Sequence, residues 1–284
     1  MELIFAAALC SVAVSILLKI CKKQGYSPVQ MITWNYAVAS ILCFFWFKPD
    51  LQHVSIQDTP WWLIITLGIL LPTIFLCLSK SLQTAGILKT EIAQRLSVVL
   101  SLTAAYFVFQ EQFNQLKIIG IVLGIGAALC ILLSNRVGPI STENPNAVGY
   151  LASVWVGYAL IDVLLKYTTG LGLQFTVALN LMFICAFILS LAYIVIKTKT
   201  VGTTQNILAG FVLGVLNFAN IALYVKAHIL LKESPAIVFA GMNILVVLLG
   251  VLGGLIIFKE KLKLVSATGL VLGIVSVLCL AYAM

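Results

Sequence analysis

The sequence predicts an all-α membrane protein with ten transmembrane helices, arranged as two inverted five-helix repeats around a central cavity. First, 62% of the 284 residues are hydrophobic and 9% are charged, whereas soluble proteins have roughly 45 to 50% and 25%. Second, apolar runs of about 20 residues, enough to cross a hydrocarbon core, recur between short polar breaks. Third, the second half of the chain repeats the first.

Charged residues and clusters of Pro and Gly mark where each helix should begin and end. We expect helices near 2–20, 28–47, 60–83, 85–109, 115–134, 147–168, 173–196, 204–229, 234–258 and 264–283. The first apolar run is followed by lysines and not by a small-residue cleavage site. We therefore expect it to be a transmembrane helix that stays in the protein, not a signal peptide. The longest polar link contains "NRVGPISTENPNAV". It suggests a first repeat at 1–137, a linker at 138–146 and a second repeat at 147–284.

The internal repeat is clearest at the end of each half. With a shift of 149 residues, "QEQFNQLKIIGIVLGIGAALCILL" lies on "KEKLKLVSATGLVLGIVSVLCLAY", and Glu111 meets Glu260. The same shift pairs Gln94 with Asn243, and a shift of 147 pairs Lys19 with Lys166. Five helices per unit is an odd number, so consecutive units must enter the membrane in opposite senses. The repeat is therefore expected to be inverted.

In these residues the chain resembles the EamA-like branch of the drug/metabolite transporter superfamily. The resemblance rests on a helix ended by a glutamate, a turn and a G-xxx-G helix, all present twice in a ten-helix chain. It implies a carrier in which both halves surround one cavity, with alternating access for export or import of a small metabolite. It also implies that the last helix of each repeat packs at the periphery and in dimer contacts. The family spans several substrate classes and does not fix the substrate.

The stretch "EIAQRLS" places Glu91, Gln94 and Arg95 in the predicted helix 85–109. Glu91 and Arg95 stand at i and i+4 in the order that favours an ion pair. One interpretation is a self-satisfied pair near the start of the helix. The other makes Arg95 the anchor of a carboxylate or phosphate, with Glu91 holding its rotamer and Gln94 adding a hydrogen bond.

The predicted helix 147–168 places four polar or aromatic side chains on one face, namely Trp155, Tyr158, Asp162 and Lys166. Ionisable side chains stay inside a membrane when they are paired, hydrated or functional. Asp162 is therefore a candidate for proton coupling. The alternative is an Asp162–Lys166 pair that ends the helix.

The helix 204–229 carries a polar stripe at spacings of 3, 4 and 4, namely Asn217, Asn220, Tyr224 and His228. These positions share one helix face and suit hydrogen bonds to a polar ligand, although helix-helix contacts are an alternative. His228 is expected to be an interfacial residue. The remaining substrate-binding candidates are Tyr158, Asn243, Trp34 and Asn35.

These observations predict a multi-pass secondary transporter of the cell membrane. We expect this membrane to be the inner membrane of a bacterium. It is expected to export a small polar or amphipathic metabolite such as an amino acid. Alternatives are an uptake carrier for a sugar or nucleotide-linked compound, and a membrane-embedded enzyme. The expected partners are a small-molecule substrate, the lipid bilayer and a proton, in a monomer or homodimer. We expect no cofactor, and no metal because the seven cysteines show no CxxC spacing. We expect no nucleic acid, because the lysines behind the net charge of +8 mostly cap the apolar runs.

Overall fold

The computed structural model describes residues 2–52, 54–55, 57, 59–109, 113–133, 146–231, 233 and 235–283. In these residues the structure is helical and has no strand. The helices are α1 (Glu2–Lys23), α2 (Pro28–Phe47), α3 (Trp61–Thr84), α4 (Ile87–Arg95), α5 (Ser97–Phe109), α6 (Gln115–Leu133), α7 (Ala147–Gly170), α8 (Phe175–Thr198), α9 (Thr204–Leu230), α10 (Pro235–Ile256) and α11 (Leu264–Tyr282).

Nine of the described helices are long and apolar enough to cross a membrane. They agree with nine predicted helices to within three residues at each end. The predicted helix 85–109 is wrong as a continuous element, because it is broken at Leu96 into α4 and α5. The break contains neither proline nor glycine, so the usual sequence signal of a helix break is missing. Glu111 and nearly all of the predicted linker 138–146 lie outside the described residues.

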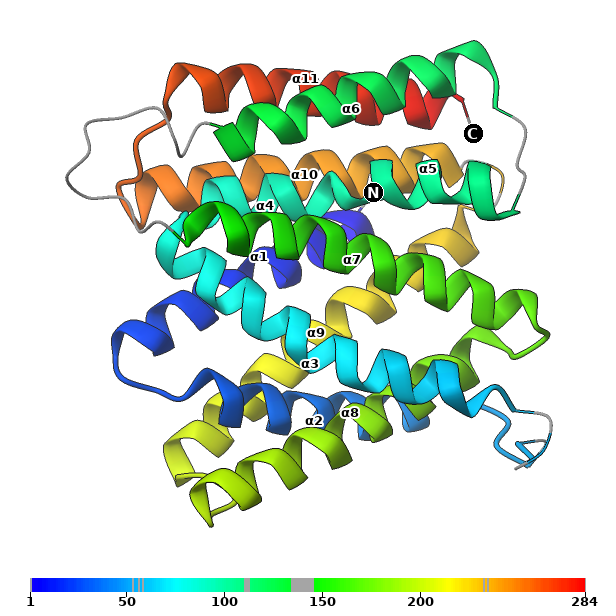
Figure 1. Ribbon diagram of the computed structural model, residues 1–284, viewed down its shortest axis with the longest axis vertical. Coiled ribbons are helices and arrows are strands. Elements are labelled where there is room, and N and C mark those ends of the chain that lie inside the picture. The colour runs from blue at the N-terminus through cyan, green and yellow to red at the C-terminus, as the bar shows by residue number, and fades with distance from the viewer. Residues whose placement is uncertain are drawn as a thin grey trace.

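The helices form a layered bundle (Figure 1). The pair α6 and α11 packs together at one edge, while α2, α8 and α9 pack at the opposite edge. Glycines allow close contact at both edges. A Cβ atom at Gly269 of α11 would lie 3.1 Å from the Cys130 Cβ of α6, and one at Gly210 of α9 would lie 2.6 Å from the Trp34 Cβ of α2. These glycines therefore serve packing within one chain.

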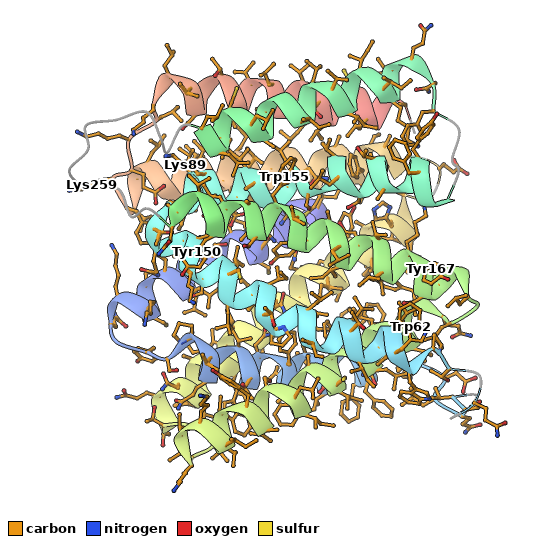
Figure 2. All side chains as sticks on the ribbon, in the orientation of Figure 1. Trp62, Lys89, Tyr150, Trp155, Tyr167 and Lys259 are labelled. Carbon is orange, nitrogen blue, oxygen red and sulfur yellow. The ribbon has the colours of Figure 1, made fainter. Side chains whose placement is uncertain are left out.

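The bundle has two ends, which we name by one residue each. The Lys19 end carries the α1–α2, α3–α4 and α10–α11 connections, and the Tyr167 end carries the α2–α3 and α7–α8 connections. Figure 2 labels Lys89 and Lys259 toward the first end, and Trp62 and Tyr167 toward the second. The rings of Trp62 and Tyr167 lie 6.3 Å apart between centroids. Both ends thus carry cationic or aromatic side chains, as membrane interfaces favour.

Candidate functional site

A cavity of about 920 Å³ lies inside the bundle, within the range of roughly 300 to 1,000 Å³ that small-molecule sites occupy. Side chains of α1, α2, α3, α4, α5, α7, α8, α9 and α10 line it. Its lining reaches Phe175 at the start of α8 and Ile229 near the end of α9, whose side chains are 37% and 60% exposed. The cavity therefore extends to the Tyr167 end.

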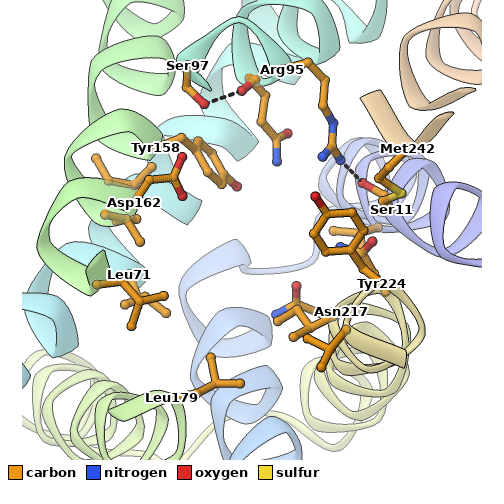
Figure 3. Close-up of a pocket in the computed structure, with 18 of the residues that line it drawn as sticks. Ser11, Leu71, Arg95, Ser97, Tyr158, Asp162, Leu179, Asn217, Tyr224 and Met242 are labelled. Carbon is orange, nitrogen blue, oxygen red and sulfur yellow. Dashed lines mark hydrogen bonds between the residues drawn. The ribbon is translucent and has the colours of Figure 1, made fainter. Parts of the chain in front are cut away.

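The cavity wall is apolar on one side and polar on the other. The helices α3 and α8 contribute Leu71, Ile74, Phe75, Leu78, Phe175, Leu179, Met182 and Phe183. Polar side chains come from α1, α2, α4, α5, α7, α9 and α10, and they are Ser11, Ser15, Tyr36, Gln94, Arg95, Ser97, Tyr158, Asp162, Asn217, Asn220, Tyr224, His228 and Asn243. Figure 3 shows Arg95, Tyr158, Asp162, Asn217 and Tyr224 around a common open centre. Such a wall suits a ligand that is itself amphipathic.

Arg95 is the one lysine or arginine among the lining residues that the structure describes. Its Nη2 donates a hydrogen bond of 2.6 Å to the Ser11 hydroxyl, and its buried Nε has no partner. The guanidinium presents five donors in a planar fork, so one hydrogen bond leaves most of them for a ligand. The arrangement suits a carboxylate or another planar anion.

The predicted ion pair between Arg95 and Glu91 does not form, and Glu91 lies outside the cavity. The Glu91 carboxylate is fully buried and accepts a hydrogen bond from Ser15 Oγ through Oε1, while its Oε2 has no partner. A Cβ atom at Gly250 of α10 would lie 2.7 Å from Glu91 Cγ. Glu91 sits one helical turn nearer the Lys19 end than Arg95, where α1 and α10 close over it.

At the break at Leu96, two side chains donate hydrogen bonds to backbone carbonyl groups. Trp155 Nε1 donates to the Leu96 carbonyl at 3.0 Å, and Ser97 Oγ donates to the Gln94 carbonyl at 2.6 Å. Buried backbone carbonyls need such partners. Since the break directly follows Gln94 and Arg95, these bonds also fix where the two cavity residues sit.

Replacing Trp155 with phenylalanine is expected to destabilise the chain. The change removes one of the two donors to the Leu96 carbonyl, which keeps the Val99 N–H at 3.1 Å, and a net hydrogen bond contributes about 0.5 to 1.5 kcal/mol. The apparent unfolding temperature in detergent should fall by roughly 2 to 4 °C per kcal/mol. Trp46→Phe is the matched control, because the Trp46 side chain is exposed on α2. Equal unfolding temperatures for the two variants would contradict the role given to Trp155.

Asp162 lies on α7 with its side chain exposed to the cavity. Its Oδ2 accepts a hydrogen bond of 3.1 Å from Ser101 Oγ of α5. Lys166, the partner that the alternative interpretation gave it, is not among the described lining residues. The carboxylate is thus placed where a bound ligand or water can reach it.

All four residues of the predicted α9 stripe line the cavity. The buried Asn220 Oδ1 has no hydrogen-bond partner. The rings of Tyr224 and His228 stack edge to face with centroids 4.6 Å apart. On α10, Asn243 donates through Nδ2 to the Phe239 carbonyl at 2.9 Å. Buried polar atoms that lack partners are costly, so the Asn220 oxygen is available to a ligand or to water.

Comparison with known proteins identifies the family. The model of the EamA-like transporter family matches residues 2–133. The chain belongs to this family. EamA-like proteins are membrane transporters, and this chain is therefore a multi-pass membrane protein of a transporter family, in agreement with the resemblance to the drug/metabolite transporter superfamily.

Two further similarities cover nearly the whole EamA-like chain. An uncharacterized protein of Haemophilus influenzae is 38% identical over 288 residues, which are 99% of this chain and 97% of that protein. A solved crystal structure of a protein superposes with a TM-score of 0.55 at 14% identity, covering 96% of each chain. That structural likeness concerns the fold alone.

Two predicted binding residues of the EamA-like chain lie away from the cavity. Trp34 donates through Nε1 to the Val201 carbonyl at 3.0 Å and packs against Phe187 and Phe211. Asn35 is fully buried, and neither polar atom of its side chain has a partner. Neither residue is part of the cavity lining.

Four polar lining residues of the EamA-like chain were not predicted from the sequence, namely Ser11, Ser15, Tyr36 and Ser97. Serines are common within membrane helices, where they bond to backbone carbonyls of their own helix. A serine in an apolar run therefore gives no cavity signal. Tyr36 follows Trp34 and Asn35 directly, and consecutive residues point to different faces of a helix. The sequence alone could not tell which of the three faces inward.

Proposed function

We propose that this chain is a secondary transporter that exports a small amphipathic metabolite, such as an amino acid, by alternating access. The observation that carries the proposal is the charge arrangement of the cavity. Arg95 and Asp162 project into one cavity from α4 and α7. A ligand with a carboxylate and an ammonium group could meet both, while its apolar part packs on the α3 and α8 wall.

The inverted repeat belongs to the same proposal. Gln94 and Asn243, which the shift of 149 residues pairs, both line the cavity. The third and eighth predicted helices, α3 and α9, both line the cavity as well. Paired helices that line one site are what two repeats related by an axis in the membrane plane would produce. This supports a transport cycle in which the two halves exchange roles.

A nucleotide-linked substrate fits the cavity less well. Phosphate groups are usually held by several basic side chains or by backbone N–H groups. Lys89 and Lys166 are not among the described lining residues, and Arg95 is the one lysine or arginine among them.

The Haemophilus influenzae relative supports a bacterial location, and we place the chain in the inner membrane.

The proposal is tested in liposomes that contain the purified chain. Uptake and efflux are measured for amino acids, sugars, nucleotides and amphipathic cations, with and without an imposed pH gradient. We expect saturable flux of zwitterions that have apolar side chains, competed by one another and not by sugars. Flux of sugars or nucleotides in place of zwitterions would replace this proposal with the uptake carrier. Protein-free liposomes give the background.

A further inference from the structure

A buried ion pair lies at the Lys19 end, beyond the cavity. Lys19 Nζ lies 2.5 Å from Glu260 Oε1, and the two side chains are 8% and 17% exposed. Lys19 stands one helical turn after Ser15, which lines the cavity. Burying charges costs free energy unless they are paired and hydrogen-bonded. The contact therefore depends on how tightly the surrounding helices close.

Glu260 also binds the first turn of α4. Its carboxylate accepts hydrogen bonds from the backbone N–H of Ile87 at 2.8 Å and of Leu88 at 3.1 Å. The first N–H groups of a helix have no partner within it and carry partial positive charge. One carboxylate thus joins the end of α1, the start of α4 and the α10–α11 connection. These elements come from opposite halves of the chain.

The space around this carboxylate is closed. A Cβ atom at Gly86 would lie 2.6 Å from Glu260 Oε2, and one at Gly254 would lie 3.0 Å from it. Gly86 has a φ of 94°, which few residues other than glycine adopt. The Phe258 ring lies beneath Lys19 Nζ, 4.5 Å from its centroid. The glycines let the helices approach until the carboxylate touches all its partners.

Two helices joined by Glu260, α1 and α4, carry part of the polar wall. α1 provides Ser11 and Ser15, and α4 provides Gln94 and Arg95. The Arg95–Ser11 hydrogen bond joins the same two helices on the cavity side. Separating Lys19 from Glu260 would free α1 from the α10–α11 connection and from the first turn of α4, and that would open a path from the Lys19 end.

We infer that Lys19 and Glu260 form the gate that closes the cavity at the Lys19 end, and that each transport cycle breaks and remakes it. The inference rests on the proposed transport function. In the present structure the cavity extends to the Tyr167 end while this contact is made. When the gate opens, water replaces the lost partners, because Lys19 lies near the end of α1 and Glu260 lies in the α10–α11 connection.

The gate is tested by labelling a cysteine in the cavity from either side of the membrane. Leu71→Cys on the apolar wall is the reporter, in a chain whose seven native cysteines are replaced with alanine. Vesicles of each orientation receive a membrane-impermeant maleimide. With the gate intact we expect labelling from the Tyr167 end. Glu260→Gln should raise the labelling rate from the Lys19 end by about tenfold, because it shifts the population from the state closed at that end to the state open there.

Lys19→Met is the second gate variant, because it removes the ion pair and leaves the carboxylate on α4. Lys23→Met is the matched control, since Lys23 also lies over the Phe258 ring, 5.2 Å from its centroid, and has no part in the proposed pair. In the chain with native cysteines, the gate variants should lower turnover about tenfold while KM stays within about twofold. A purely structural role would not shift the sidedness of labelling.

Unchanged labelling and unchanged turnover in both folded gate variants would overturn the inference. Labelling needs no substrate, so its outcome is independent of the flux screen. A chain that shifts its labelling and transports none of the compounds tested would keep the gate and lose the proposed substrate class. Transport of zwitterions with no shift in labelling would keep the proposed function and remove the gate.

Discussion

Replacing Arg95 with glutamine is expected to raise the KM for amino acids by about 10- to 150-fold. Hydrogen bonds to a charged group contribute about 1.5 to 3 kcal/mol, and each 1.4 kcal/mol is a tenfold change in affinity. Arg95 is the one arginine or lysine among the described lining residues. Among them, its guanidinium donates a hydrogen bond to Ser11 alone. Flux in proteoliposomes, measured against substrate concentration, gives the effect.

The chemical origin of this loss is tested with a substrate that lacks the carboxylate. The parent protein should prefer an amino acid to the amine that has the same side chain and no carboxylate. Arg95→Gln should remove that preference. Arg95→Lys keeps the charge but loses the planar fork, so we expect an intermediate KM. An undiminished preference for the amino acid in folded Arg95→Gln would show that the carboxylate binds elsewhere.

The sequence predicted most of the helices because bilayer thickness fixes the length of an apolar run. Nine helices follow from this rule, and the break at Leu96 does not. At the break, the Leu96 carbonyl accepts a hydrogen bond from Trp155, which lies 59 residues later in the chain. A local pattern carries no information about such a donor. Tertiary contacts therefore determine the one place where the predicted helices differ from the structure.

Of the residues that helical spacing selected, the α9 stripe lines the cavity and Glu91 does not. Asn217, Asn220 and Tyr224 share a helix face, and the cavity extends along that face over two turns of α9. Glu91 shares a face with Arg95 but lies one turn away, where Ser15 and α10 enclose it. Periodicity reports the direction of a side chain around the helix axis. It does not report where along that axis the cavity ends, because this depends on the neighbouring helices.

Replacing Asp162 with asparagine is expected to abolish substrate accumulation driven by a pH gradient. A carboxylate at a membrane cavity can carry a proton between the two faces, whereas an amide cannot. If one proton moves with each substrate, a gradient of one pH unit, which is 1.36 kcal/mol, supports at most about tenfold accumulation. The variant should stay near onefold and still exchange substrate across the membrane. Fluxes under imposed gradients of either sign measure this.

Two comparisons separate proton coupling by Asp162 from binding of a substrate ammonium group. If Asp162 only binds ammonium, Asp162→Asn raises the KM for amino acids and spares their deaminated analogues, with accumulation intact at saturation. Ser101→Ala removes the hydrogen bond to Asp162 Oδ2 and keeps the carboxylate, so coupling should survive. Glu91 is the competing carboxylate, since it is fully buried and its Oε2 has no partner. Loss of accumulation in Glu91→Gln with normal accumulation in Asp162→Asn would move the proton site from α7 to α4.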